Sequence, residues 1–247
     1  MKKIDIHCHV LPKLDDGSAS FAESLKMLKL AYKQGIEAVI ATPHASHQFK
    51  EVSPEDIKNL CRALEIRAQK EVSPDFRIYP GQEIFYSSDT LEKLERGQLL
   101  TMAGSDYILL EFMPNVPYSE IFGAVRELTM ARYRPILAHV ERYGVLRVKG
   151  RIEELLEAGA YTQMNYRRIG GKWYEETVRW CRKMLKQGNI HFLATDMHNT
   201  KSRKPETIPA ETWMGKHLEK SKYKSVCYGN AEKIFKAPEM IEYMKKI

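Results

Sequence analysis

Two histidines near the amino end of the chain, His7 and His9, are the first residues whose type and spacing could do chemistry. The segment 3–9 alternates with the two-residue period of a strand, so both imidazoles project from one face while Cys8 points to the other. Two neutral imidazoles on one face form a ready metal chelate, because each offers a nitrogen lone pair. Asp5 shares that face, either as a hydrogen-bond partner for a metal-bound histidine or as a structural carboxylate.

Seven further ionisable side chains stand at, or just beyond, the carboxyl ends of apolar runs: Asp16, His44, Glu83, Glu111, His139, Asp196 and His198. Burying so many polar groups without partners would be costly, and metal coordination removes that cost. The donors are oxygen and imidazole nitrogen without sulfur, which favours Mn²⁺ or iron over a lone Zn²⁺. Nine ligands exceed the needs of one ion, so we expect two or three ions, either Mn²⁺ or iron, with zinc or magnesium as alternatives.

Alternating strands and helices must position these side chains. Apolar runs predict strands after the first one at 36–41, 76–82, 107–110, 135–138, 161–165 and 190–195. Apolar residues at helical spacing predict helices between them at 21–32, 53–68, 90–96, 118–133, 152–158 and 173–186. About seven such units imply parallel strands, closed as a barrel or doubly wound. In a barrel the carboxyl ends of the strands converge on one mouth, where active sites lie.

Composition narrows the class of protein. The chain of 247 residues is 43% hydrophobic and 29% charged, which predicts one soluble globular domain over residues 1–247. No apolar run reaches the roughly 20 residues of a membrane span, and polar residues 5–9 interrupt any signal-peptide core, so we expect a cytoplasmic protein. Four scattered cysteines argue against a disulfide framework or a thiolate metal cluster. The formal charge of +7 suits an acidic partner.

Short motifs that contain the candidate ligands follow one another along the chain: His7-Cys8-His9, Asp15-Asp16-Gly17, Thr42-Pro43-His44, Gly81-Gln82-Glu83, Glu111, His139-Val140-Glu141-Arg142-Tyr143 and Thr195-Asp196-Met197-His198-Asn199. In this order the set resembles the polymerase and histidinol phosphatase (PHP) superfamily. Within it, the chain is most similar to the bacterial manganese-dependent protein-tyrosine phosphatases of the CpsB/YwqE type, from capsule and exopolysaccharide operons. The resemblance covers nearly the whole chain.

The resemblance implies a distorted (β/α)7 TIM-like barrel, the PHP fold, with three metal ions at the carboxyl mouth of the strands. It implies one ion held by His7, His9, Glu83 and Asp196, a second by Glu83, Glu111 and His139, and a third by Asp16, His44 and His198. It also implies a phosphotyrosine protein as substrate, in the family the tail of a bacterial tyrosine kinase. Neither nucleic acid nor membrane insertion is expected, and the oligomeric state is left open.

Two arginines lie close to the predicted ligands in sequence. Arg142 follows His139 by three residues, and Arg203 follows His198 by five. Near a metal centre, a guanidinium can neutralise a bound phosphate and donate two hydrogen bonds to it. Members of the resembling family have arginines at the matching positions in substrate binding and catalysis.

The metal ions would lower the pKa of a water to give the attacking hydroxide. Asp196, Glu141 or a metal-bound water could then protonate the leaving phenolate, and the sequence does not decide among them.

Other interpretations are weaker. Cys61 and Arg67 match the C-x5-R signature of cysteine-dependent phosphatases, but inside a helix six residues leave the two side chains about 120° apart. The loop 167–172 is basic and is either solvated or in contact with an acidic substrate, and His47 is expected to be an exposed loop histidine. The competing functions are another PHP activity (histidinol phosphatase or nuclease), an amidohydrolase, and a non-catalytic PHP-fold regulator. No predicted strand ends in the lysine that amidohydrolases commonly carboxylate, and an intact ligand set argues against a regulator.

Overall fold

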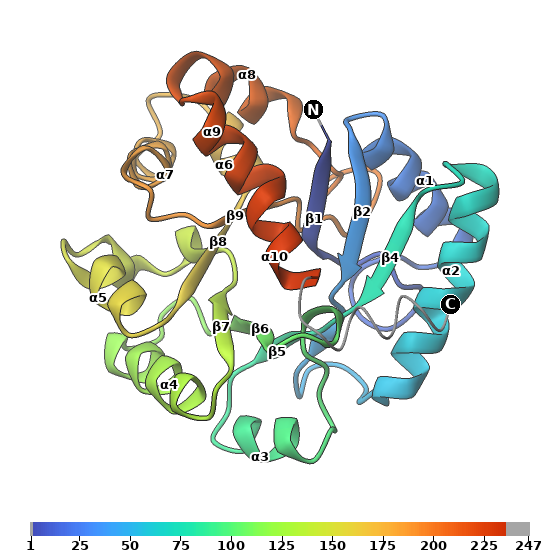
Figure 1. Ribbon diagram of the computed structural model, residues 1–247, viewed down its shortest axis with the longest axis horizontal. Coiled ribbons are helices and arrows are strands. Elements are labelled where there is room, and N and C mark those ends of the chain that lie inside the picture. The colour runs from blue at the N-terminus through green and yellow to red at the C-terminus, as the bar shows by residue number, and fades with distance from the viewer. Residues whose placement is uncertain (1, 236–247) are drawn as a thin grey trace.

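The computed structural model describes residues 2–235, so both ends of the predicted 1–247 domain lie outside the described residues (Figure 1). Its strands are β1 (Lys3–Cys8), β2 (Ile36–Ala41), β3 (His44–Ala45), β4 (Arg77–Pro80), β5 (Glu83–Phe85), β6 (Tyr107–Glu111), β7 (Arg134–Leu137), β8 (Tyr161–Asn165) and β9 (Phe192–Ala194). Its helices are α1 (Phe21–Tyr32), α2 (Pro54–Glu71), α3 (Thr90–Glu95), α4 (Tyr118–Met130), α5 (Arg151–Glu157), α6 (Tyr166–Gly170), α7 (Glu176–Gln187), α8 (Ile208–His217), α9 (Lys220–Lys224) and α10 (Asn230–Phe235).

The strands form a ring of seven parallel positions. They pair in the orders β1-β2-β4 and β3-β5-β6-β7-β8-β9, and every pairing is parallel. Two-residue breaks at 42–43 and 81–82 divide two of the positions into β2 with β3 and β4 with β5. A bridge between Cys8 and Met197 joins β1 to the segment after β9 and closes the ring. This curled parallel sheet is the distorted barrel that the family resemblance implies, and it excludes the doubly wound alternative.

Helices surround the ring, and α10 lies across one of its ends (Figure 1). Ala231 and Ile234 of α10 belong to a buried apolar cluster that includes Tyr107 and Phe192, the first residues of β6 and β9. The α10 helix therefore packs at the amino ends of the strands. The carboxyl ends lie at the opposite mouth, where the sequence predicts the site.

Local signals explain where several elements begin. The Ser53 hydroxyl accepts a hydrogen bond from the Asp56 amide at 3.1 Å, and Pro54 occupies the first turn of α2, as predicted. Gly35 has a φ of 85°, a left-handed conformation that lets the chain turn from α1 into β2. No helix in the described part of the chain has the length and apolar character needed to cross a bilayer.

The structure corrects the prediction of a loop over 167–172. Residues 166–170 form α6, and Ile169 within it is fully buried. The guanidinium of Arg182 donates hydrogen bonds to the Ile169 and Gly171 carbonyl oxygens, which satisfies polar groups at the end of this short helix. Arg167 and Arg168 are exposed, so the basic character of the segment faces solvent as expected.

Candidate metal centre

The structure places all nine predicted ligands at the carboxyl mouth of the barrel. Their donor atoms form four overlapping groups in which each atom lies within 4.8 Å of the others: His9, Asp16, His44 and His198; His7, His9 and Asp196; His7, Glu83 and His139; and His44, Glu83 and Glu111. Relative to the three predicted sets, His9 joins the third set, and Glu83 is not in the group of His7, His9 and Asp196. The second set divides, because Glu83 and His139 group with His7 while Glu83 and Glu111 group with His44. Shared donors are typical of ions that sit close together.

Glu83 is at the centre of these groups, and only 1% of its surface is exposed. Its Oε2 lies 3.1 Å from His7 Nε2, 3.2 Å from His9 Nε2 and 3.2 Å from His44 Nδ1. Its Oε1 lies 2.8 Å from His139 Nε2. One buried carboxylate therefore faces imidazoles from three other strand positions, which is the geometry of a bridging ligand.

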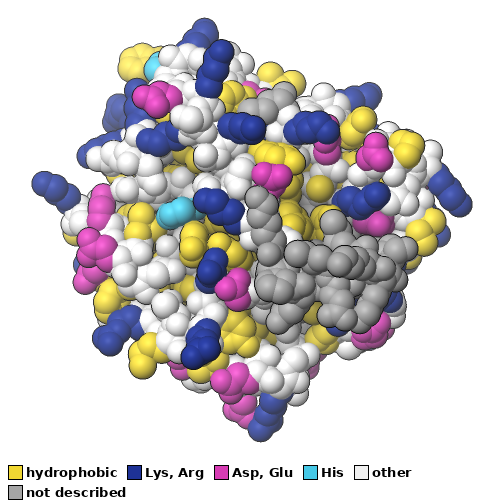
Figure 2. Space-filling model, viewed as in Figure 1, with side chains coloured by type: hydrophobic (Ala, Val, Ile, Leu, Met, Phe, Trp, Pro, Cys, Tyr) yellow, Lys and Arg dark blue, Asp and Glu magenta, His cyan; other side chains and the backbone are white. Residues whose placement is uncertain are grey.

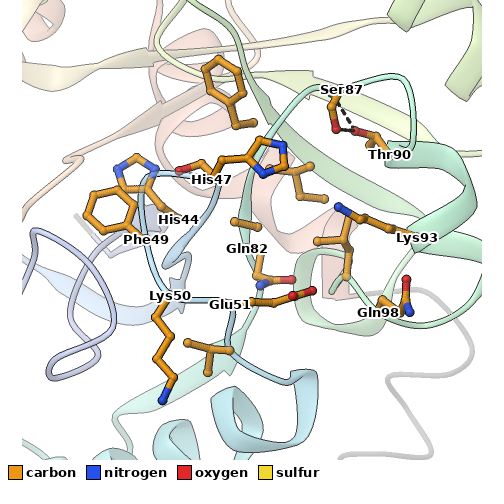
Figure 3. A pocket seen from close by; sticks show the side chains of 16 residues that line it. His44, His47, Phe49, Lys50, Glu51, Gln82, Ser87, Thr90, Lys93 and Gln98 are labelled. Carbon is orange, nitrogen blue, oxygen red and sulfur yellow. Dashed lines mark hydrogen bonds between the residues drawn. The ribbon is translucent and has the colours of Figure 1, made fainter.

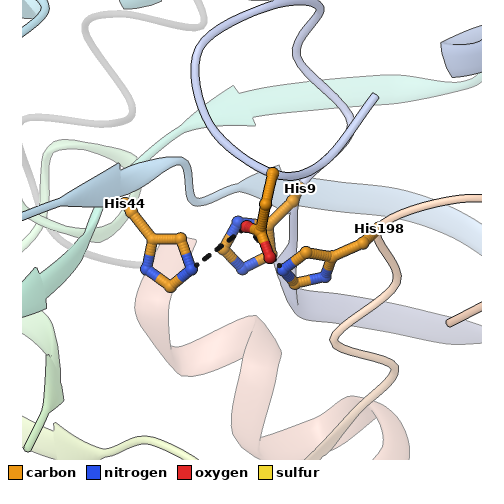
Figure 4. Close-up of side chains that lie close together, drawn as sticks. His9, His44 and His198 are labelled. Atoms are coloured by element: carbon orange, nitrogen blue, oxygen red, sulfur yellow. Dashed lines mark ion pairs between the residues drawn. The ribbon is translucent and has the colours of Figure 1, made fainter. Parts of the chain in front are cut away.

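The third predicted set, Asp16, His44 and His198, lies together, and Figure 4 shows the rings of His44 and His198 beside that of His9. Asp16 Oδ1 lies 3.5 Å from His44 Nε2 and 3.3 Å from His198 Nε2. The rings of His9 and His198 are 3.8 Å apart, centroid to centroid. The nitrogen His198 Nε2 is buried and has no hydrogen-bond partner among the described residues. A nitrogen lone pair held there beside a carboxylate is suited to a metal ion.

Outer hydrogen bonds decide which nitrogen of each ring faces the centre. His9 Nδ1 lies 2.7 Å from Asp15 Oδ2, and His198 Nδ1 lies 3.0 Å from the Asp196 carbonyl oxygen. Because these oxygens accept, the Nδ1 atoms carry the protons and the Nε2 lone pairs point inward. His7 Nε2 and His9 Nε2 lie only 3.3 Å apart, so two inward lone pairs there would repel each other unless a proton or a metal ion lies between them. The donor set fits divalent cations on this ground.

Carboxylates make the centre attractive to cations. Burial alone would lower the pKa of His44, but hydrogen bonds with Asp16 and Glu111 raise it to about 11. Burial would likewise lower the pKa of His9, yet the charge and hydrogen bond of Asp15 raise it to about 9. Without metal, the His44 and His9 rings therefore hold protons whose positive charge pairs with the carboxylates. Divalent cations would replace that positive charge, and their binding would release the protons.

Two of the candidate ligands have strained backbones. His139 has a φ of 32° and Asp196 a φ of 52°, both in the left-handed region that non-glycine residues rarely adopt. Each follows the end of a strand, β7 or β9, where the chain leaves the barrel. Such strain persists only where the surroundings hold it, and it is concentrated at functional sites.

Arg142 and Arg203 both reach the centre and meet at Asp196. Arg142 Nη2 donates to Asp196 Oδ2 at 2.6 Å, and Arg203 Nη2 donates to Asp196 Oδ1 at 2.9 Å. Arg142 Nη1 also lies 3.5 Å from Glu111 Oε1, and Arg203 Nη1 lies 3.2 Å from Asp16 Oδ2. About a third of each arginine side chain is exposed, so both can meet a ligand that enters from solvent.

The sequence did not assign a role to three side chains that contact the ligands. Asp15 Oδ2 also accepts a hydrogen bond from the backbone N–H of His44 at 3.0 Å, so it supports both His9 and His44. Its position next to Asp16 in the sequence was the feature that could have identified it. Gln163 and Asn165 of β8 contact His7 and Asp196 through their amides. Neither amide titrates or chelates strongly, so nothing in the ligand pattern identified them.

Other candidates take structural roles. Asp5 accepts hydrogen bonds from the amides of His7 and Thr195 and from the Thr195 hydroxyl, so it fixes the backbone and does not contact an imidazole. Cys8 is fully buried. Burial raises the pKa of the Cys61 thiol in α2, and Arg67 stacks over Phe21, so the C-x5-R match forms no phosphate loop.

A cavity of about 290 Å³ adjoins the centre, lined in part by the 44–52 loop, β5 and the start of α3 (Figure 3). His44 lies at its edge, and the ring of Phe49 stacks on His44 with centroids 5.1 Å apart and an interplanar angle of 3°. His47 also lines the cavity and is exposed, as predicted for a loop histidine.

Comparisons with known proteins agree with this geometry. A family model described as capsular polysaccharide synthesis, CpsB/CapC, matches residues 3–236. The tyrosine-protein phosphatase CpsB of Streptococcus pneumoniae is 34% identical over 238 residues, which cover 94% of this chain and 97% of that protein. The tyrosine-protein phosphatase YwqE of Bacillus subtilis (strain 168) is 34% identical over 210 residues, covering 84% of this chain and 82% of that protein. One solved chain matches with a TM-score of 0.86 and 31% identity, covering 94% of this chain and 93% of that chain. It comes from the crystal structures of YwqE from Bacillus subtilis and CpsB from Streptococcus pneumoniae, described as unique metal-dependent tyrosine phosphatases.

Proposed function

The chain belongs to the CpsB/CapC family, and on that premise we propose that it is a metal-dependent protein-tyrosine phosphatase. The observation that carries the proposal is the set of nine imidazole and carboxylate side chains gathered around the buried Glu83. Relatives that cover nearly the whole chain are named for the same activity.

We propose Mn²⁺ as the metal, with two or three ions held by the nine side chains. The groups contain imidazole nitrogen and carboxylate oxygen and no cysteine, a donor set that suits Mn²⁺ or iron better than a lone Zn²⁺. Bound there, such ions supply Lewis-acid activation of water for attack on phosphorus. Glu83 would bridge them, and Asp15 would orient the His9 ring.

Arg142 and Arg203 are the proposed phosphate-binding residues. Their guanidinium groups already pair with carboxylates at the mouth, so each is close enough to move its hydrogen bonds to a phosphoryl group. Donors aimed at charge that develops in the transition state lower the barrier most. The negative charge of Asp196 would in turn hold both guanidinium groups in place.

Asp196 is a poor candidate for the general acid. Burial favours its protonated form, but the nearby imidazoles of His7 and His139 more than offset this and hold its pKa below the usual range. Burial raises the pKa of Glu141. Its Oε1 accepts a hydrogen bond from the backbone N–H of Asn165 at 3.3 Å. The leaving phenolate would therefore be protonated by Glu141 or by water rather than by Asp196.

The proposed substrate is a phosphotyrosine segment of a bacterial tyrosine kinase that acts in capsule or exopolysaccharide synthesis in the cytoplasm. The net charge of +7 favours capture of an acidic segment. On the face shown in Figure 2, lysine and arginine side chains are scattered among acidic ones rather than gathered in one patch. That distribution gives no support to a nucleic-acid surface on this face.

The test is a comparison of substrates at saturating Mn²⁺: a phosphotyrosine peptide, the matched phosphoserine peptide, histidinol phosphate and single-stranded DNA. We expect the phosphotyrosine peptide to have the highest kcat/KM, because its phosphate reaches farther into a recessed centre. Equal turnover of phosphoserine would favour a general phosphatase. Preference for histidinol phosphate or DNA would replace the proposal with another PHP activity.

A further inference from the structure

The strand β8 contributes none of the nine candidate ligands, yet it lies between β7 and β9, which lead into His139 and Asp196. Two of its side chains, Gln163 and Asn165, contact ligands on either side of it. Gln163 is fully buried.

The hydrogen bonds of Gln163 fix the direction of its amide. The backbone N–H of His139 can only donate, and it donates to Gln163 Oε1 at 2.7 Å. The same oxygen lies 3.0 Å from His7 Nδ1, which must therefore carry a proton and leave the Nε2 lone pair directed at the metal centre. One amide oxygen thus selects the tautomer of His7 and satisfies the strained backbone of His139.

The same direction of hydrogen bonding continues from Gln163 through Asn165 to Asp196. Gln163 Nε2 donates to Asn165 Oδ1 at 2.9 Å, which leaves the Asn165 amide nitrogen to donate to Asp196 Oδ2 at 2.9 Å. An ionised Asp196 carboxylate can only accept hydrogen bonds, so the Asn165 amide must donate to it. This agrees with the Gln163 orientation that the His139 backbone N–H requires. Reversing either amide would place donor against donor or oxygen against oxygen.

We propose that Gln163 and Asn165 form an amide relay that positions His7, His139 and Asp196 for metal binding. The relay rests on the proposed metal centre but not on the phosphatase activity. Both amides are positioning residues, since neither needs to touch the metal or the substrate. Outer partners of metal ligands typically change metal affinity by about 10–100-fold when they are removed.

The test is titration of metal-free protein with Mn²⁺ alone, following free Mn²⁺ by electron paramagnetic resonance, with thermal unfolding of the metal-free proteins alongside. Gln163→Leu removes the accepting oxygen, and we expect its Mn²⁺ affinity to fall by about 10–100-fold with little change in the melting temperature. Gln163→Glu keeps an oxygen for His7 and His139 but loses the N–H that donates to Asn165 Oδ1, so it should recover only part of the lost affinity. Met164→Leu is the matched control, because Met164 is buried on the same strand and faces the apolar core. It should bind Mn²⁺ like wild type.

Wild-type affinity in Gln163→Leu would overturn the relay. So would a loss of which Gln163→Glu recovers no part, or one that Met164→Leu shares, because either result indicates packing. Wild-type protein that binds no Mn²⁺ would overturn both the relay and the metal centre. Protein that binds Mn²⁺ through the relay but does not hydrolyse phosphotyrosine would overturn the proposed function and leave the relay standing.

Discussion

At the scale of single residues, Glu83 is the carboxylate on which the proposed centre depends most. Both of its oxygens face imidazoles, with Oε1 2.8 Å from His139 Nε2 and Oε2 3.1 Å from His7 Nε2. Glu83→Gln keeps the shape and removes the charge, so we expect bound Mn²⁺ to fall and kcat/KM to drop by more than about a hundredfold, beyond the loss typical of an outer partner. Metal analysis and steady-state kinetics measure both. A variant that retains wild-type metal content would remove Glu83 from the ligand set.

The two arginines at Asp196 provide a second residue-scale prediction. Losing a hydrogen bond to a charged group costs about 1.5–3 kcal/mol, so Arg142→Ala and Arg203→Ala should each lower kcat/KM on a phosphotyrosine peptide by roughly tenfold or more. Arg67→Ala is the control, because Arg67 stacks on Phe21 away from the metal groups. The measurement is kcat/KM of all three variants on the same phosphotyrosine peptide. Arginine variants at the mouth that behave like Arg67→Ala would contradict a phosphate-binding role.

The buried thiols separate metal chemistry from cysteine chemistry. Burial raises the pKa of Cys61, so its thiol stays protonated and is a poor nucleophile. We expect Cys61→Ala to keep kcat within a few fold, whereas His139→Ala should lose orders of magnitude. Turnover of a phosphotyrosine peptide by both variants checks this. Trapping of a phosphate ester on Cys61 would reverse the assignment.

At the scale of elements, the loop between β1 and α1 carries Asp15 and Asp16 and passes very close to β1. A Cβ on Gly17 would lie 2.4 Å from the His9 carbonyl oxygen, so a larger residue must push the loop away from the centre. We expect Gly17→Ala to weaken Mn²⁺ binding by about tenfold or more, the effect of losing an outer partner such as Asp15. Gly123→Ala in α4, whose Cβ would meet nothing within 4 Å, is the matched control. Equal Mn²⁺ affinity in a titration of the two variants would show that the loop tolerates the shift.

Strong local patterns made most elements predictable. The apolar run 36–41 is β2 residue for residue, and the Ser53-Pro54 start of α2 appears where capping places it. The predicted ends of the helices were less accurate. The helix predicted over 118–133 ends at Met130, and the helix predicted to begin at 173 begins at Glu176. The bounds of the helices from 208 to 235 were not predicted, because the polar helical stretch around His217 has no clear amphipathic pattern to mark where a helix begins or ends.

The candidate ligands were predictable because charged side chains at the ends of apolar runs are unusual. Their partners were not, because tertiary contacts select them. Gln163 and Asn165 have the side chains of an ordinary polar strand, and only the closed barrel brings them against His7 and Asp196. Asp5 shows the converse, since it shares the ligand face in sequence but hydrogen-bonds to the backbone of His7 and Thr195.

At the scale of the whole molecule, the site exists only when the ring of strands is closed. His7 at one end of the chain and Asp196 near the other are joined by a backbone hydrogen bond from the Asp196 amide to the His7 carbonyl oxygen at 2.9 Å. The other candidate ligands lie between them along the chain, except His198, which follows Asp196 by two residues. Folding of the barrel and assembly of the metal centre are therefore one event, and bound metal should stabilise the folded chain.

The central claim is that this assembled centre works only with metal bound. The most direct test removes metal from the purified protein with a chelator, then restores Mn²⁺ stepwise while hydrolysis of a phosphotyrosine peptide is measured. We predict no activity in the metal-free protein and recovery in proportion to bound Mn²⁺. Full activity of the metal-free protein would contradict the claim.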